Sequence, residues 1–168
     1  ALGGPGLPMA LVLLRPELAV LQPGAHNGTV RGHTLAFVAA AAALERWRAP
    51  GFEAMGNATS ETLRTALEAI VVRHPGHGGH VRGRGLILGI GWDDPTIASR
   101  VSAAAFENGV IAETTGSSDQ VIKLLPPLTI SDEELARGLE GLERAVSRVL
   151  EAENSDPRRQ TSQLAAAE

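Results

Sequence analysis

The 168-residue sequence predicts an α/β fold in which strands and helices alternate along the chain. Three observations support this prediction. Residues 9–14 form a continuous apolar run between Pro8 and Pro16, which is typical of a strand buried on both faces of a parallel sheet. Segments rich in Ala and Leu with helical spacing follow, and further short apolar runs lie between them. Alternation of this kind is typical of the α/β class, and α+β is the related alternative.

The composition excludes several kinds of protein. Hydrophobic residues make up 43% of the chain and charged residues 20%, the balance of a soluble globular protein. A net charge of -4 argues against a nucleic-acid partner, which needs clustered Lys and Arg. The absence of Cys excludes disulfides, thiolate zinc sites and a cysteine nucleophile, and favours the cytoplasm. The apolar runs are too short to span a bilayer.

The N-terminal third is predicted to contain a loop followed by two helices. Residues 15–32 are rich in Pro and Gly and are expected to form the loop. Residues 33–48 are rich in Ala and Leu and indicate a tightly packed helix that ends before Pro50. A second helix is predicted over residues 52–73, with one apolar stripe made of Phe52, Met55, Leu63, Leu67 and Ile70.

The next segment is predicted to contain a turn, a strand and a capped helix. Residues 75–79 are rich in Gly and His and indicate the turn, and residues 86–90 are the expected strand. Asp94 is a preferred N-cap residue, and Pro95 suits the first helical position. Asn108 and the glycine after it favour the end of this helix.

The C-terminal segment is predicted to contain two short strands and a long helix. The strands are expected at residues 110–113 and 121–125, on either side of a polar turn. Ser131 and Glu134 have the spacing of a capping box, in which the Ser hydroxyl and the Glu carboxylate each accept a backbone N–H at the start of the helix. The tail from about residue 154 lacks periodicity and is expected to be disordered. The helix is expected to bury Leu135, Leu139, Leu142, Val146 and Val149.

Three segments resemble class III aminotransferases that depend on pyridoxal 5'-phosphate. They are GPGLPMALVLLRPEL at 4–18, HNGTVRGHTLAF at 26–37 and HVRGRGLILGI at 80–90, the last resembling the first strand of the small domain. The resemblance implies a fragment of a fold-type I transferase. On this basis residues 1–50 are expected to end the large cofactor-binding domain, 51–152 to form the C-terminal small domain, and 153–168 to be the disordered tail.

A fourth segment, IAETTGSSDQVIKLLPPLTISDEEL at 111–135, resembles the diaminobutyrate transaminases of ectoine synthesis. Their sequences read Val-Ile-Lys or Val-Val-Lys where most class III members have Arg. The resemblance implies transfer of an amino group from glutamate to aspartate semialdehyde, giving diaminobutyrate and 2-oxoglutarate. The alternatives are another class III ω-aminotransferase, of the ornithine, 4-aminobutyrate or acetylornithine type, and a non-catalytic remnant that packs on a partner.

The resemblance also implies roles for individual residues. The Schiff-base lysine is expected just before Ala1, so the chain would contain no catalytic residue and would be inactive alone. In the full-length homodimer or higher homo-oligomer, Thr29 with Gly28 beside it would contact the cofactor phosphate across the subunit interface. Lys123, the chain's single lysine, would bind the substrate α-carboxylate. The alternatives for Lys123 are a Schiff-base lysine with lowered pKa and an exposed strand residue.

Other patterns predict no further site. Arg82 and Arg84 are two arginines in an acidic chain, and the resemblance makes them structural. His74, His77 and His80 recur at every third position, but they lie in a Pro/Gly loop without nearby carboxylates. We therefore expect neither a nucleic-acid surface nor a metal site.

Overall fold

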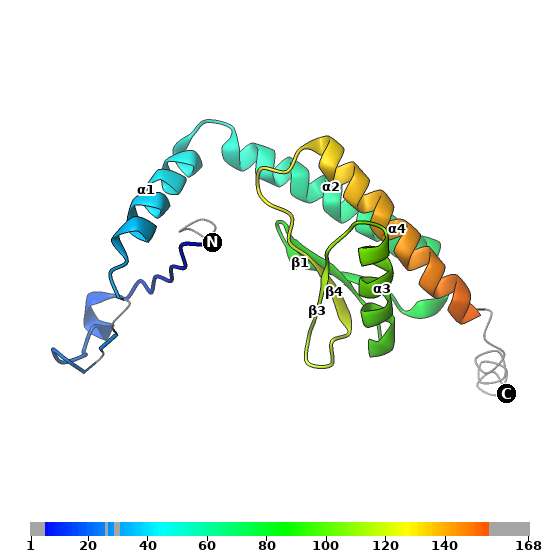
Figure 1. Cartoon of the computed structure of the whole chain (residues 1–168), viewed down its shortest axis with the longest axis horizontal. Coiled ribbons are helices and arrows are strands. Elements are labelled where there is room, and N and C mark those ends of the chain that lie inside the picture. Colours follow the sequence, from blue (N-terminus) through cyan, green and yellow to red (C-terminus); the bar gives the residue numbers. More distant parts are fainter. Residues whose placement is uncertain (1–5, 26, 29–30, 155–168) are drawn as a thin grey trace. The chain divides into compact units, whose positions relative to one another are not determined.

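A computed structural model describes residues 6–25, 27–28 and 31–154 of the chain (Figure 1). The chain forms two compact units, Ala1–Glu53 and Ala54–Glu168. None of the helices in the described ranges is long and apolar enough to cross a membrane.

The first unit contains a short 3-10 helix, η1 (Pro16–Leu18), and the helix α1 (Thr34–Arg48). The bounds of α1 confirm the predicted helix to within one residue, and the ring nitrogen of His33 caps it by accepting the Ala36 N–H. The predicted close packing of this helix is wrong, because only Ala36 and Ala40 are buried in it. The loop predicted before it is confirmed where the structure describes it, and η1 is a short helical turn within it.

The strand predicted at residues 9–14 is wrong. These residues form no strand, and Leu11, Val12 and Leu13 are 58%, 78% and 92% exposed. A β-strand persists only where a neighbouring strand accepts and donates its backbone hydrogen bonds. No strand within the described residues pairs with this run, so its apolar side chains have no sheet in which to be buried.

The second unit contains a four-stranded, fully antiparallel sheet in the order β1-β2-β4-β3. The strands are β1 (His80–Arg84), β2 (Ile87–Gly91), β3 (Glu113–Thr115) and β4 (Val121–Leu124). The segment 80–90 therefore forms a hairpin rather than one strand, because Gly85 adopts a φ of +58° and reverses the chain. The strand predicted at 110–113 begins later, at Glu113.

Three helices of this unit confirm their predicted bounds closely. They are α2 (Phe52–Arg73), α3 (Pro95–Glu107) and α4 (Asp132–Asn154). Asp94 caps α3 by accepting the Thr96 N–H at 2.9 Å, and Asn108 ends the helix as predicted. In α2 the predicted stripe is confirmed at Leu63, Leu67 and Ile70, whereas Met55 is exposed.

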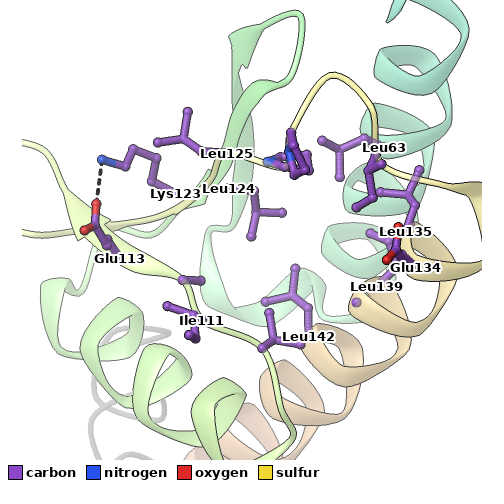
Figure 2. A pocket seen from close by; sticks show the side chains of 16 residues that line it. Leu63, Ile111, Glu113, Lys123, Leu124, Leu125, Glu134, Leu135, Leu139 and Leu142 are labelled. Atoms are coloured by element: carbon purple, nitrogen blue, oxygen red, sulfur yellow. Dashed lines mark ion pairs between the residues drawn. The ribbon is translucent and has the colours of Figure 1, made fainter. Parts of the chain in front are cut away.

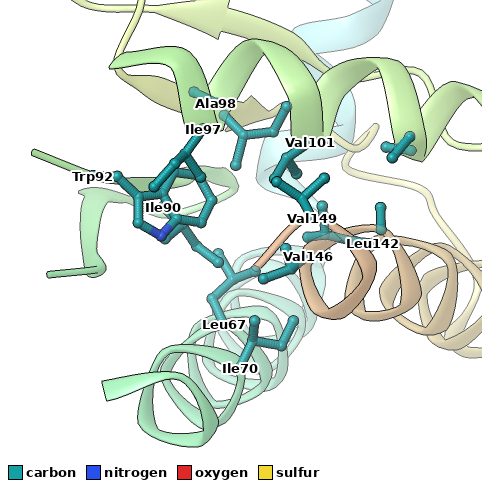
Figure 3. Packing of buried hydrophobic residues seen from close by; sticks show 14 of the residues in the cluster. Leu67, Ile70, Ile90, Trp92, Ile97, Ala98, Val101, Leu142, Val146 and Val149 are labelled. Carbon is teal, nitrogen blue, oxygen red and sulfur yellow. The ribbon is translucent and has the colours of Figure 1, made fainter. Parts of the chain in front are cut away.

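The core lies between one face of the sheet and these helices. Figure 3 shows side chains of α2, α3 and α4 converging on Ile90 and Trp92 from β2 and the residue after it. Ile90 and Ile122 are register partners on β2 and β4, and both are fully buried. The helical contribution comes mainly from Leu67, Ile70, Ile97, Val101, Leu142, Val146 and Val149. The sheet and the helices share this core. The packing of the helices against the sheet therefore fixes the position of β4.

We expect Ile90→Ala to lower the free energy of unfolding by about 2–5 kcal/mol, because it leaves a cavity in a fully buried site. Ile87→Ala is the matched control, since Ile87 lies on the same strand but is 62% exposed. This control should change stability by only about 0.5 kcal/mol. Urea unfolding followed by circular dichroism measures both, and equal losses would contradict the described core.

Candidate functional site

A row of four residues crosses the sheet on the face opposite the core. Arg82 on β1 pairs in register with Gly89 on β2, Gly89 pairs with Lys123 on β4, and Lys123 pairs with Glu113 on β3. Register partners in a sheet project from the same face, and neighbours along a strand project from opposite faces. Because Ile122 points into the core, Lys123 points away from it.

Lys123 and Glu113 form an ion pair across β3 and β4. The Nζ of Lys123 lies 2.9 Å from the Oε2 of Glu113. The lysine side chain is 27% exposed and the glutamate side chain 73% exposed. Opposite charges at directly paired positions of antiparallel strands stabilise each other modestly, by about 0.2–1 kcal/mol. The pair therefore holds the lysine amine in a defined place without removing it from solvent.

The same pair borders a cavity of about 450 Å³. Figure 2 shows the ion pair at one end of this cavity, while Leu63, Leu135 and Leu139 lie toward the other end. Its walls come from β4 and the loop after it, from the segment before β3, and from α2 and α4. The lining residues are Leu63, Val110–Glu113, Lys123–Pro127, Ile130, Glu134, Leu135, Gly138, Leu139 and Leu142. The site is thus a mainly apolar hollow bordered by the Lys123–Glu113 ion pair and by the side chain of Glu134.

Local sequence explains why β4 ends beside this cavity. Pro126 and Pro127 lack backbone N–H groups, so they cannot continue the antiparallel ladder after Leu124. The chain then turns into α4, whose start is fixed by the capping box predicted from the sequence. The Ser131 N–H and hydroxyl both donate to the Glu134 carboxylate, and the Glu134 N–H donates to the Ser131 hydroxyl oxygen. The prediction of this box is confirmed.

The capping box lowers the pKa of Glu134. The largest cause is the hydrogen bond from the Ser131 backbone N–H, followed by that from the Ser131 hydroxyl. The nearby charge of Arg137 adds a smaller lowering effect. Glu134 is therefore held as a carboxylate at the wall of the cavity.

The predicted phosphate loop belongs to the first unit. The Gly28 carbonyl accepts the Arg31 N–H at 3.2 Å, and a Cβ at Gly28 would meet the Arg31 side chain at 2.9 Å. Thr29, the residue predicted to bind phosphate, lies outside the described residues. The role predicted for Gly28 and Thr29 stays a prediction.

Among the described residues, no group of His, Asp or Glu is placed to hold a metal ion. Of the three regularly spaced histidines, His74 contacts the Ser147 hydroxyl at 3.3 Å, and the His80 ring lies 3.4 Å from the Gly78 carbonyl.

Sequence reasoning missed Glu113 as a site residue. The residue fell in a predicted strand, but its partner in the sheet depends on the register of β3 against β4. The available signal was a glutamate and a single lysine on two strands joined by a polar turn, which suits a cross-strand ion pair. That signal does not choose among neighbouring registers, so it does not identify the pair.

The architecture and the site together define the class of protein. The antiparallel sheet with helices on one face matches part of several aminotransferase structures. An ornithine aminotransferase from Toxoplasma gondii matches with a TM-score of 0.69 and 25% identity, over 80% of this chain and 32% of that chain. An N-acetylornithine aminotransferase from Stenotrophomonas maltophilia matches with a TM-score of 0.60 and 28% identity, over 70% and 32% of the two chains. The predicted fold, a part of the fold-type I transferase, is confirmed.

The sequence profile of the aminotransferase class-III family matches residues 1–146, so the chain belongs to that family. Curated relatives are similar over most of its length. A diaminobutyrate–2-oxoglutarate transaminase of Nocardia farcinica is 49% identical, covering 89% of this chain and 34% of its own. The corresponding protein of Halalkalibacterium halodurans is 44% identical, covering 90% and 35%. The chain thus spans about a third of the length of the curated relatives it matches.

The described residues do not by themselves fit a pyridoxal phosphate site. Covalent attachment of that cofactor needs a lysine amine able to act as a nucleophile. The chain's only lysine is held as an ion pair by Glu113 on the small sheet. No catalytic step can therefore be assigned to the described residues.

The lowered pKa of Glu134 predicts a pH effect on stability. A carboxyl group with a lower pKa in the folded state stabilises the fold above its unfolded pKa. That stability is lost as the pH falls through the folded pKa. We therefore expect the stability advantage of the wild type over Glu134→Gln to shrink between about pH 7 and about pH 3. Urea unfolding at several pH values measures it.

Glu133→Gln is the control for this effect. Glu133 is an exposed neighbour in the same first turn of α4, and no capping hydrogen bond to it occurs among the described residues. If Glu133→Gln and Glu134→Gln showed the same pH dependence, the general charge of the helix start, rather than the capping box, would be responsible.

Proposed function

We propose that the chain is the C-terminal portion of a pyridoxal-phosphate-dependent transaminase that interconverts diaminobutyrate with 2-oxoglutarate as the acceptor. In the biosynthetic direction, the amino group would pass from glutamate to aspartate semialdehyde. The similarity to curated proteins with this name, at 41–49% identity, supports the proposal. The single structural observation that carries it is the position of Lys123 at the edge of the cavity.

Lys123 is proposed to bind the substrate carboxylate. Its amine is held on the sheet face that faces away from the core, beside a cavity and within partial reach of solvent. A lysine there is a point charge, so it gives a single contact rather than the bidentate fork of an arginine. This geometry favours carboxylate binding over the two alternatives. A Schiff-base lysine needs a free amine, and an ordinary exposed strand lysine would border no cavity.

Gly28 and Thr29 are proposed to contact the cofactor phosphate. A side chain at position 28 would crowd the Arg31 side chain. A glycine allows the backbone to approach an anion closely. When bound, the cofactor supplies the electron sink of the reaction. We propose that its lysine lies outside these 168 residues.

The alternative ω-aminotransferase functions have weaker support. Solved structures named for ornithine and acetylornithine aminotransferases match at 25–28% identity, whereas the diaminobutyrate relatives reach 49%. Lys123 also stands where most of the family has Arg, which supports the diaminobutyrate reading.

We propose that residues 1–50 end the large domain, that 51–152 form the small domain, and that the whole enzyme is a homodimer or a higher homo-oligomer. Location in the cytoplasm and a role in ectoine synthesis are proposed from the amino-acid composition and the sequence resemblance alone.

A chimera tests the proposed activity. We would replace the matching C-terminal third of the Nocardia farcinica relative with this chain and measure glutamate-dependent amination of aspartate semialdehyde. The chimera is expected to be active with added pyridoxal phosphate. Lys123→Ala should lower kcat/KM about tenfold to hundredfold, because it removes a charge-assisted hydrogen bond to the carboxylate.

Lys123→Arg is the conservative control and should retain most of the activity, since a cation remains at the same place. Urea unfolding of each chimera separates loss of binding from loss of structure. A soluble, folded chimera that prefers ornithine or 4-aminobutyrate as amino donor, or a fully active Lys123→Ala chimera, would contradict the proposed function.

A second prediction concerns the chain alone. Mixed with pyridoxal phosphate and reduced with borohydride, it is expected to give no stoichiometric adduct at Lys123, because Glu113 engages the amine in an ion pair. Peptide mapping by mass spectrometry measures the adduct, with Glu113→Gln as a control that releases the amine. A stoichiometric adduct on wild-type Lys123 would identify it as the cofactor lysine and overturn its proposed role.

A further inference from the structure

The dipeptide Asn-Gly occurs at two places in the chain, and the two places differ in their surroundings. Asn27 and Gly28 are both exposed and lie outside any helix or strand. Asn108 and Gly109 end α3, where Asn108 is half-buried. The two dipeptides have the same covalent structure, so a difference in their reactivity comes from the fold.

An asparagine that precedes a glycine can lose its side-chain amide without an enzyme. The glycine nitrogen attacks the Cγ atom of the asparagine and forms a new C–N bond. The bond between Cγ and Nδ2 breaks, and ammonia leaves with the proton of the glycine N–H. Water then opens the succinimide ring to give aspartate or isoaspartate. Glycine is a favourable neighbour because it has no Cβ to hinder ring closure and its backbone is flexible.

The end of α3 holds Asn108 in a conformation that cannot close this ring. The Nδ2 of Asn108 donates to the Ala104 carbonyl at 2.8 Å, and its Oδ1 accepts the Nε–H of Arg144 at 3.3 Å. The Gly109 N–H, which would have to react, donates to the Phe106 carbonyl at 3.0 Å. The Asn108 ψ of 10° nearly eclipses the two backbone nitrogens, so the Gly109 nitrogen is turned away from the Asn108 Cβ. The ring can therefore close only when the end of α3 opens.

Asn27 lacks these restraints within the described part of the chain. Its side chain makes no hydrogen bond to another described residue. The hydrogen bond that Gly28 makes there uses its carbonyl oxygen, which accepts the Arg31 N–H at 3.2 Å, and leaves the Gly28 nitrogen available to react. Because both residues are exposed, water can accept the proton of the Gly28 N–H and then open the ring.

We propose that Asn27–Gly28 is a site of spontaneous deamidation, and that folding protects Asn108–Gly109 from the same reaction. The reaction needs water as its only co-reactant. It replaces a neutral amide by a carboxylate at position 27, and the isoaspartate product also adds a CH₂ group to the backbone. The first unit therefore acquires a negative charge as the protein ages.

The added charge has a consequence for cofactor binding, and this consequence rests on the proposed function. Gly28 and Thr29, the two residues that follow Asn27, are the proposed contacts of the cofactor phosphate. A carboxylate directly before them repels a phosphate dianion. We expect the deamidated protein to bind pyridoxal phosphate about tenfold more weakly.

Peptide mapping by mass spectrometry measures both sites in one sample. We would incubate the chain and the chimera in mildly alkaline buffer, with and without concentrated urea, and use circular dichroism to establish folding without urea. Asn27 is expected to react within about threefold of its rate in urea, and Asn108 at least about tenfold more slowly than in urea. Equal protection of both sites, or protection of neither in the folded protein, would overturn the proposal.

Arg144→Ala tests the protection of Asn108. It removes the N–H that the Asn108 Oδ1 accepts and should speed deamidation there about threefold or more, without changing the rate at Asn27. Arg148→Ala is the matched control, because Arg148 lies about one turn further along α4 and pairs with Glu107 instead. Asn108 should stay protected in this control. Equal acceleration in the two variants would contradict protection by the contact with Asn108.

Asn27→Asp in the chimera reproduces the aspartate product and tests the consequence for the cofactor. Asn27→Ser is the neutral control. Titration with pyridoxal phosphate, followed by absorbance, should show weaker binding in Asn27→Asp alone. Equal affinities in the two variants would overturn this consequence. A chimera that binds no cofactor without either substitution would contradict the proposed function, and the deamidation rates would still support or overturn the modification site.

Discussion

The antiparallel pairing of β2 with β4 is the constraint on which the rest of the second unit depends. It places Ile90 opposite Ile122 beneath the helices and Gly89 opposite Lys123 on the other face. Side chains alternate along a strand with a period of two, so a slip of one residue would turn Lys123 into the core and Ile122 out to solvent. Burying a charged amine without a partner costs roughly several kcal/mol. The core therefore favours the register that leaves Lys123 on the face of the sheet away from the helices.

The same register brings two charges together that the sequence keeps apart. Glu113 and Lys123 are ten positions apart in the chain and meet because β3 adds to the outer edge of β4. The prolines after β4 and the capping box at Ser131 then turn the chain into α4, whose leucines form the apolar wall of the cavity. A mainly apolar cavity bordered by charged side chains suits a ligand that has an aliphatic chain and a charged group.

The two units differ in whether the described residues supply partners for strand pairing and cover for apolar side chains. In the second unit, strands pair with strands and the helices cover a continuous core. In the first, the apolar run at 9–14 is exposed, since no described strand supplies its backbone partners. The curated relatives are about three times as long as this chain.

The sequence by itself determined the helices, because their signals are local. Capping residues such as Asp94 and Ser131 act on N–H groups within three positions, and helical periodicity repeats within one segment. Residue patterns also indicated the family and singled out Lys123. Only the tertiary structure decided the hairpin at 80–91, the failure of the strand at 9–14 and the pairing of Lys123 with Glu113. Each of these depends on which strand lies beside which, and hydrogen bonds between strands are not encoded in any single segment.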